Sequence, residues 1–225
     1  SSIANTEKLN QDKQNILLAR GPAKRLTGEM IRDNALVASG LLNDRIGGES
    51  VKPYQPNGLW KVNGAEYIED KGDKMYRRSM YTIWKRSVPN PTIATFDAPD
   101  RSYCIIQRQE TNTPLQALVL LNDPTFIEAA RVLGEKMLVY DNPEESIDFT
   151  FRKLTGRKAK MEELTVLVAL FQDEYELFKA NPRKAEGWLN TGQFRIISDE
   201  DRLKVAANAV VASTIMNADA TITKR

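Results

Sequence analysis

The sequence predicts a mainly α-helical, multi-helix domain of bundle-like form, with one long irregular insertion and little or no sheet. Three observations support this prediction. Apolar residues recur at helical spacing over most of the chain, proline and small polar residues stand where these stretches begin, and glycines and prolines break the pattern from residue 43 to residue 74. With 41% hydrophobic and 28% charged residues, the composition is that of an ordinary globular chain. We expect residues 1–225 to form a single domain.

Two helices are expected before the irregular segment. The polar stretch Glu7–Leu18 predicts a first helix that frays, or a linker, within residues 1–20. A second helix is expected to have Pro22 in its first turn and to end near Gly40. The residues expected along its buried stripe are Leu26, Met30, Val37 and Leu41.

Residues 43–74 are expected to be irregular. Loops longer than about 15 residues are uncommon in compact domains unless they bind something or wrap a surface. Two interpretations stay open: an ordered wrap with a short hairpin over residues 59–70, which we favour, or a ligand-binding loop. The next stretch, residues 75–86, spaces its large side chains like a helix, and its aromatic content would also fit a strand. We favour a helix there.

Caps mark the helices of the second half. Thr113, Pro114 and Gln116 have the pattern of a capping box, which stabilises a helix start by about 1 kcal/mol. Asp123 and Asn142, each followed by proline, predict two further starts. A long amphipathic helix is expected to end at Asn181, and a last one to run from Ser198 to Asn217, so that residues 142–217 form a helical C-terminal half. The stripe expected after Asp123 is Phe126, Ala130, Leu133 and Met137.

Composition excludes several kinds of chemistry. The chain has no histidine, so it contains no Ser-His-Asp triad, no Cys-His pair, no His-ligated zinc and no c-type haem attachment. The 32 Lys and Arg nearly balance the 30 Asp and Glu, which gives no global field to attract nucleic acid. No apolar run is long enough to span a membrane. The single cysteine, Cys104, has apolar neighbours and is expected to be a buried, inert thiol.

Four segments, taken in order, resemble one family: RLTGEMIRDNALVASGLL, GGESVKPYQPNGLW, YRRSMYTIWKRSVPNPTIATFDAPDR and QETNTPLQALVLLNDPTFIEAAR. They are similar to the C-terminal domain of planctomycete-type cytochrome c proteins, a domain of unknown function. The resemblance implies an exported bacterial multidomain protein, periplasmic or at the cell surface, often with a c-type haem module upstream. No haem motif occurs here, so a haem cofactor would belong to an upstream domain. The start at Ser1 also leads us to expect a mature fragment or excised domain.

Arginines interleaved with aromatic residues form the first candidate site. Guanidinium groups bind sulfate, phosphate or carboxylate through paired hydrogen bonds, and flanking rings can stack on sugars, which would suit an anionic polysaccharide. The alternative, slightly favoured, is that these arginines pair with Asp97, Asp100 and Glu110 and lock the long loop in place. The cluster contains Arg77, Arg78, Arg86, Arg101 and Arg108, and the residues expected to face a ligand are Arg77, Arg78, Arg86, Asp97, Arg108 and Asn112.

Carboxylates form the second candidate site. Asp97 and Asp100 are the candidates for proton transfer in a glycan-acting enzyme, if their surroundings separate their pKa values. Glu29 is expected to pair with Arg25 and Arg32 at helical spacing instead. A hard cation at Asp97, Asp100, Glu110 and Asn112 lacks any EF-hand spacing, so we expect no metal site.

Three functions therefore stay open. The leading one is an accessory or ligand-recognition domain of an exported, cytochrome-associated protein that binds polysaccharide and contacts its own upstream domains. The second is an enzyme domain, either a carboxylate-based glycan hydrolase or the substrate domain of a haem-linked dehydrogenase. The third is a structural scaffold whose polar cluster only holds the long loop.

Overall fold

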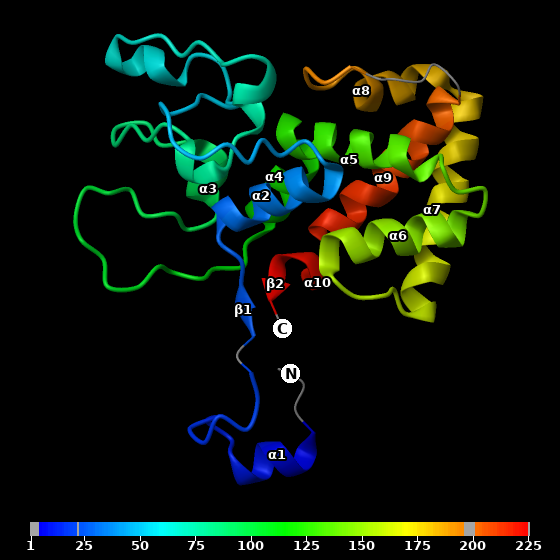
Figure 1. Cartoon of the computed structure of the whole chain (residues 1–225), viewed down its shortest axis with the longest axis horizontal. Helices are drawn as coiled ribbons and strands as arrows, with labels where there is room; N and C mark the ends of the chain where they lie inside the picture. Colours follow the sequence, from blue (N-terminus) through cyan, green and yellow to red (C-terminus); the bar gives the residue numbers. More distant parts are fainter. Residues whose placement is uncertain (1–4, 22, 196–200, 225) are drawn as a thin grey trace.

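Helices α5 (Pro124–Met137) and α9 (Arg202–Asn217) pack closely at the centre of the fold (Figure 1). The computed structural model describes residues 5–21, 23–195 and 201–224. A Cβ on Gly134 of α5 would lie 2.7 Å from the carbonyl oxygen of Val205, so any larger residue would push the two helices apart. The Nδ2 group of Asn208 donates a hydrogen bond to the Gly134 oxygen at 3.2 Å. This crossing forms the centre of the hydrophobic core.

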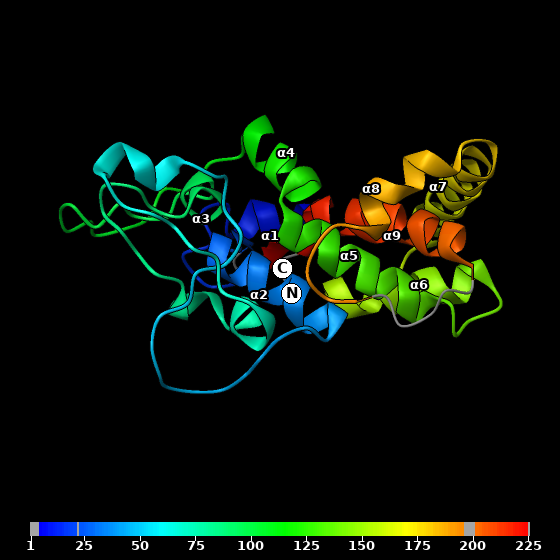
Figure 2. The ribbon, with the colours of Figure 1, turned by 90° about the horizontal axis from the view of Figure 1, so that it is seen from above.

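Several other helices pack around this pair (Figures 1 and 2). The long α7 (Met161–Ala180) packs on α9, α6 (Pro143–Thr155) lies against α5, α7 and α9, and α2 (Gly28–Ser39) packs on α5. We call α2 and α4 to α10 the helical body. Its shorter elements are α4 (Pro114–Asn122), the 3-10 helix η4 (Pro182–Ala185), α8 (Glu186–Leu189) and α10 (Asp219–Ile222).

The predicted mainly α-helical fold class is confirmed. Over the described residues, the only sheet is a two-stranded antiparallel pair, β1 (Lys24–Arg25) with β2 (Thr223–Lys224). This pair ties the chain before α2 to the end of the chain. In the described part of the protein, no helix is both long and apolar enough to cross a membrane.

The helix starts predicted from caps are confirmed in the second half. Gln116 Oε1 accepts a hydrogen bond from the Thr113 backbone N–H at 3.3 Å, completing the capping box of α4. Asp123 caps α5 by accepting from Thr125 N at 2.8 Å, and Asn142 caps α6 in the same way. The stripe Phe126, Ala130, Leu133 and Met137 is buried as expected. The expected cap Ser198 lies outside the described residues.

The N-terminal predictions are partly wrong. Helix α1 ends at Gln11 instead of Leu18, because the Asp12 carboxylate accepts from the backbone N–H groups of Ile16 and Leu17 and bends the chain. It stands apart from the rest of the protein (Figure 1). Helix α2 was expected to have Pro22 in its first turn, but it begins later, at Gly28, after the N-cap Thr27. Pro22 itself lies outside the described residues.

The predicted stripe of α2 is also wrong in part. Met30 and Val37 are 56% and 57% exposed, whereas Ile31 and Leu36 are buried. Helix α2 buries a different face because it packs on α5 on one side and on the segment around residue 79 on another. The predicted end at Gly40 is confirmed, since Gly40 takes φ 75° at the C-cap.

Residues 41–112, which we call the irregular half, contain short 3-10 helices and α3 (Pro91–Thr95). The hairpin expected over residues 59–70 is wrong, because η1 (Leu59–Asn63) occupies its first part. The helix favoured over residues 75–86 is wrong too. Only the turns η2 (Gly72–Tyr76) and η3 (Ser79–Tyr81) form there, and the chain between and after them is extended. The reason lies in side chains of α2, which bind the backbone of this segment.

Candidate ligand-binding site

Arg32 of α2 holds the backbone of the irregular half. Its side chain is buried, and Nη1 donates to the carbonyl oxygen of Arg77 at 2.9 Å while Nη2 donates to that of Met75 at 2.7 Å. The neighbouring Asp33 accepts from both the backbone N–H and the hydroxyl of Ser79, each at 2.7 Å. These bonds use backbone groups that a helix over residues 75–86 would need for itself.

Arg77 extends this lock to the long loop. It is 5% exposed, and its Nη2 donates to the carbonyl oxygens of Arg45 at 2.8 Å and Gly47 at 2.6 Å, while Nη1 donates to that of Glu49 at 3.3 Å. The guanidinium also lies 3.9 Å from the ring centre of Tyr81. The slightly favoured hypothesis of an arginine lock on the loop therefore has structural support at Arg77, although the lock binds carbonyl oxygens instead of Asp97, Asp100 or Glu110.

Arg108 pairs with Glu29, which lies 79 residues away in the sequence. The two hydrogen bonds are parallel, with Nη1 to Oε2 at 2.8 Å and Nη2 to Oε1 at 2.9 Å. Burial raises the pKa of Glu29, but the hydrogen bonds and charge of Arg108 outweigh it and leave the pKa below its usual value. The expected pairing of Glu29 with Arg25 and Arg32 is wrong, because Arg32 points into the irregular half.

The two candidate catalytic aspartates lie in different surroundings. Asp97 has φ 60°, and its carboxylate accepts from the backbone N–H of Thr111 at 2.8 Å and from Gln116 Nε2 at 3.4 Å. It therefore closes the base of the loop that residues 98–110 form. Asp100 is exposed and accepts from the backbone N–H of Ser102 at 2.9 Å. Their roles in catalysis or ligand binding stay predictions.

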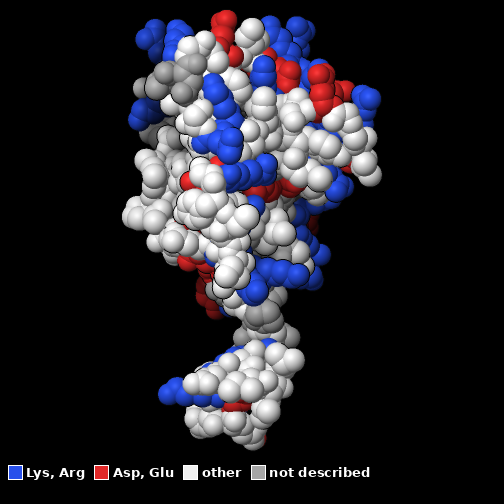
Figure 3. Space-filling view, turned by 90° about the vertical axis from the view of Figure 1, so that its left-hand side faces the viewer, with Lys and Arg blue, Asp and Glu red and all other residues white. Residues whose placement is uncertain are grey.

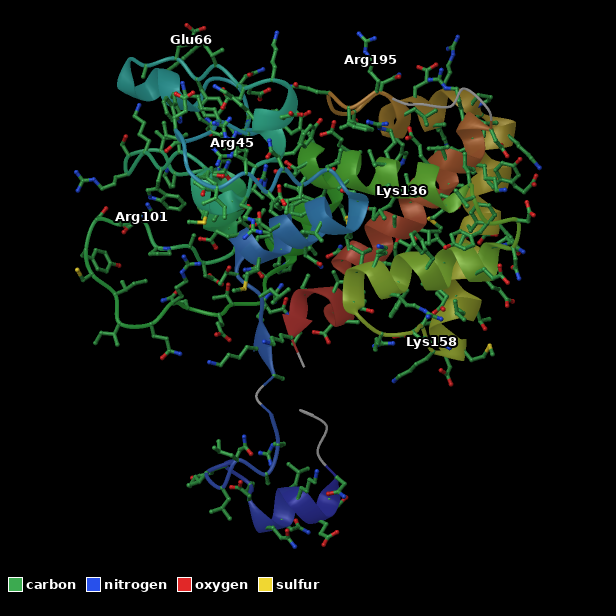
Figure 4. All side chains as sticks on the ribbon, viewed as in Figure 1. Arg45, Glu66, Arg101, Lys136, Lys158 and Arg195 are labelled. Carbon is green, nitrogen blue, oxygen red and sulfur yellow. The ribbon has the colours of Figure 1, made fainter. Side chains whose placement is uncertain are left out.

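The other arginines of the cluster are exposed. Figure 3 shows Lys and Arg side chains across the face that the irregular half presents. Arg101, at the outer edge in Figure 4, lies 4.9 Å from the ring centre of Trp84. Arg78, Arg86 and Asn112 are also exposed, so they are placed where a ligand in solution can reach them.

Cys104 lies on the same outer loop and is exposed, so the prediction of a buried thiol is wrong. Its neighbours Tyr103 and Ile105 are 71% and 40% exposed. Apolar neighbours in the sequence did not imply burial here, because this loop extends away from the core (Figure 4).

A pocket of about 800 Å³ opens where the irregular half meets the helical body. We call it the main pocket. Its size is in the range typical of small-molecule sites. One wall comes from the loop of residues 54–57, another from α3, and a third from the end of α4 and the start of α5. The lining residues are Tyr54, Gln55, Pro56, Asn57, Glu69, Pro91, Thr92, Thr95, Leu118, Val119, Asn122, Asp123, Pro124, Thr191 and Gly192.

The surface of this lining is mostly apolar, and its polar groups are acidic or uncharged. It has two carboxylates, Glu69 and Asp123, and several amides and hydroxyls, while none of the described residues that line it is Lys or Arg. The Asp123 carboxylate is already held by hydrogen bonds from the Thr92 hydroxyl and the Thr125 backbone N–H. Among the described residues, Glu69 accepts one long hydrogen bond, from the Gln55 backbone N–H at 3.4 Å. Glu69 is therefore the freer of the two acids.

A buried carboxylate lies next to two residues of the lining, Tyr54 and Gly192. Glu128 of α5 is fully buried, and its Oε1 accepts from the Tyr76 hydroxyl at 2.9 Å and from the Phe194 backbone N–H at 2.7 Å. Burial, followed by the charge of Glu128, raises the pKa values of both Tyr54 and Tyr76 above their usual value. These two phenols therefore stay protonated and can donate hydrogen bonds across the physiological pH range.

The strap of residues 191–194 closes one side of the pocket over Glu128. Gly192 has φ 96°, and a Cβ there would lie 2.2 Å from Cδ of Glu128, so this position requires glycine. Gln193 joins the strap to the irregular half, with Gly72 N donating to its Oε1 and its Nε2 donating to the Asp70 oxygen, each at 3.2 Å. Two distant segments are thus fixed around one hollow.

A smaller hollow of about 290 Å³, which we call the side pocket, adjoins the main pocket. Both are lined by Pro56 and Asn57, which form a ridge between them. The other residues of the side pocket are Gly58, Trp60, Lys61, Glu66 and Tyr67. Across the described residues, no group of three or more His, Cys, Asp or Glu side chains is placed to hold a metal ion.

Sequence reasoning missed both pockets. The residues of the main pocket come from stretches more than a hundred positions apart, and no motif joins them. Those of the side pocket all lie within residues 56–67, where no motif marks a site. The one useful signal was the length of the irregular segment, which left a ligand-binding loop open as an alternative.

Residues 1–171 match the family described as PSD1: Protein of unknown function (DUF1553). The chain belongs to the PSD1 family. The domain of unknown function expected from the sequence resemblance is therefore confirmed, while its cytochrome setting stays a prediction. No curated protein and no solved structure matches this PSD1 protein.

Proposed function

We propose that this PSD1 protein is a ligand-recognition domain whose main pocket binds an uncharged, polyhydroxylated ligand, namely a saccharide. The lining of the pocket supports this proposal: it offers carboxylates, amides and hydroxyls beside apolar proline and leucine surfaces, and its described residues include no Lys or Arg. Sugar hydroxyls donate to carboxylates and amide oxygens and accept from amide and phenol groups, and the faces of a sugar ring pack on apolar surface.

An anionic ligand suits the main pocket poorly, because the carboxylates of Glu69 and Asp123 would repel it. A cationic ligand is the stronger competitor. It is less favoured because hydrogen bonds from Thr92 and Thr125 already satisfy much of the negative charge on Asp123. Anionic polysaccharide remains a proposal for the exposed arginines Arg78 and Arg86 on the outer face.

The setting of the domain is a separate proposal. An exported protein with a haem-bearing domain upstream rests on the sequence resemblance alone, and its test is the full reading frame, inspected for a signal peptide and a Cys-x-x-Cys-His motif. Neither feature would be found if the proposal is wrong.

Isothermal titration calorimetry tests the binding proposal. The probes are the neutral hexasaccharides cellohexaose and xylohexaose, a heparin-derived hexasaccharide as the sulfated arm, and spermine as the cationic arm. We expect a neutral probe to bind with a Kd below 1 mM, and Glu69→Gln to weaken it about 10-fold, because a hydrogen bond to a charged group contributes about 1.5–3 kcal/mol. Arg78→Met, on the outer face, is the matched control and should leave the Kd unchanged.

Other outcomes of the titration would refute the proposal. Binding of spermine alone would assign the pocket to cations. Binding of the heparin probe alone, lost in Arg78→Met, would move the site to the arginines. The same mixtures, followed by chromatography for shortened products, test the enzyme alternative: turnover that Asp97→Asn and Asp100→Asn abolish would make the domain a glycan hydrolase instead.

A further inference from the structure

The two hollows on either side of residues 56–57 are parts of one surface. The main pocket is large enough for a small-molecule ligand, whereas the side pocket, at about 290 Å³, is just below the usual size range of an independent site. Because Pro56 and Asn57 line both, a ligand that fills the main pocket needs only to pass over this ridge to enter the side pocket. The side pocket therefore suits an extension of the same ligand.

Buried donors lie on both sides of the ridge. The Nε2 group of Gln55 in the main pocket and the Nε1 group of Trp60 in the side pocket are buried, and neither has a hydrogen-bond partner in the described part of the chain. Buried donors are rarely left unpaired in native proteins, because each costs about 1–3 kcal/mol. The residue Trp60 is 9% exposed, and its ring is fixed edge-on against Tyr67 with the ring centres 5.1 Å apart.

The mouth of the side pocket is charged. Lys61 and Glu66 are both exposed and of opposite sign, and the Nζ groups of Lys85 and Lys52 lie 4.5 Å and 6.0 Å from the ring centre of Trp60. Figure 4 places Glu66 at the outer edge of the irregular half, open to solvent. The Lys61 and Glu66 side chains can hydrogen-bond to hydroxyls that project from a chain leaving the ridge.

We propose that the main and side pockets form one continuous site for an oligosaccharide chain that crosses the Pro56–Asn57 ridge. This inference rests on the proposed function. The main pocket holds the first units of the chain, and the side pocket holds the next unit against Trp60, Lys61 and Glu66. Affinity must then grow with chain length, and the side pocket must contribute only when the chain is long enough to reach it.

A chain-length series tests this inference. The neutral sugar that binds in the titrations above is compared as mono-, di-, tetra- and hexasaccharide. We expect the hexasaccharide to bind at least 10-fold more tightly than the disaccharide. The double variant Lys61→Gln, Glu66→Gln should remove most of that gain, by about 5-fold or more, and leave disaccharide binding unchanged. Both positions are exposed, so these changes should not disturb folding.

Fluorescence gives a second readout. The protein has three tryptophans, so a variant with Trp84→Phe and Trp188→Phe leaves Trp60 as the reporter. Its emission should shift with the hexasaccharide and not with the disaccharide. Equal affinity for all lengths above the disaccharide, or a hexasaccharide Kd unchanged in the Lys61, Glu66 double variant, would overturn the continuous site and leave the proposed function standing. No binding at any length would overturn both.

Discussion

Arg77 and Arg78 are neighbours that the sequence places in one ligand-facing cluster, yet the structure gives them opposite surroundings. Arg77 is buried and donates to three backbone carbonyl oxygens of the long loop. Arg78 is exposed, and its side chain makes no hydrogen bond or ion pair among the described residues. Replacing each in turn with methionine, which keeps the apolar stem, separates the two roles.

The expected cost of Arg77→Met follows from these contacts. A hydrogen bond to a charged group contributes about 1.5–3 kcal/mol, but the loop it holds is exposed, so water can replace part of each bond and about 1 kcal/mol per bond is the better figure. Losing the stacking of the guanidinium on Tyr81 adds about 0.5–1 kcal/mol. The three bonds and the stacking together contribute about 3.5–4 kcal/mol, and losing them in a domain of this size lowers Tm by about 7–16 °C. Arg78→Met should stay within about 0.5 kcal/mol of the parent.

Urea denaturation followed by circular dichroism, with a thermal scan beside it, measures both variants. Limited proteolysis adds a local readout, since Arg77→Met should expose residues 45–49 to cleavage while the helical body persists. Equal midpoints for the two variants would refute the lock. A loss of saccharide binding in Arg77→Met with unchanged stability would refute it as well, and would return Arg77 to the ligand-facing set.

Two further predictions concern single residues. Gly192→Ala should weaken saccharide binding about 10-fold in calorimetry, because the added Cβ would displace the strap from Glu128. Gly187→Ala is the control and should bind normally, because no atom lies within 4 Å of the Cβ added there. Equal affinities of the two variants would refute the role of the strap. Hydrogen bonds from Arg157 are the largest cause that lowers the pKa of Glu163 from its usual 4.5 to about 2. Because folding lowers the pKa of this carboxylate, its charged form stabilises the fold above pH 4.5, and this stabilisation is lost as the pH falls towards 2. Glu163→Gln should therefore cost about 1 kcal/mol of unfolding free energy at pH 7 and nothing at pH 2. The figure at pH 7 is reduced because the pair is partly exposed. Urea midpoints at the two pH values check this, and an equal cost at both would contradict it.

Helix starts could be predicted because their causes are local. Thr113 and Gln116 lie three residues apart, and Asp123 and Asn142 each bond to a backbone N–H two residues on. Such contacts depend on the immediate sequence and hardly on the rest of the fold. The fold class followed from the same evidence, since well-capped apolar stretches at helical spacing dominate the chain.

Residues 75–86 show where local evidence fails. Their spacing favours a helix, but Arg32 lies more than forty positions earlier and donates to the carbonyl oxygens of Met75 and Arg77. A periodic pattern carries no information about a side chain from another element that competes for the same backbone groups. The predicted ion-pair partners of Glu29 were wrong for the same reason, because its actual partner Arg108 is remote in sequence and close in space.

The main pocket keeps its shape only if the irregular half and the helical body hold a fixed position relative to each other. The helical body supplies the end of α4 and the start of α5, whereas the irregular half supplies residues 54–57 and Glu69. Arg32 and Arg77 fix the irregular half at one end, and Gln193 joins it to the strap at the other. Buried polar contacts of this kind add little net stability compared with apolar packing, but they allow few alternative arrangements. The arginines therefore serve the site from a distance: they do not line the pocket, yet they keep one of its walls in place.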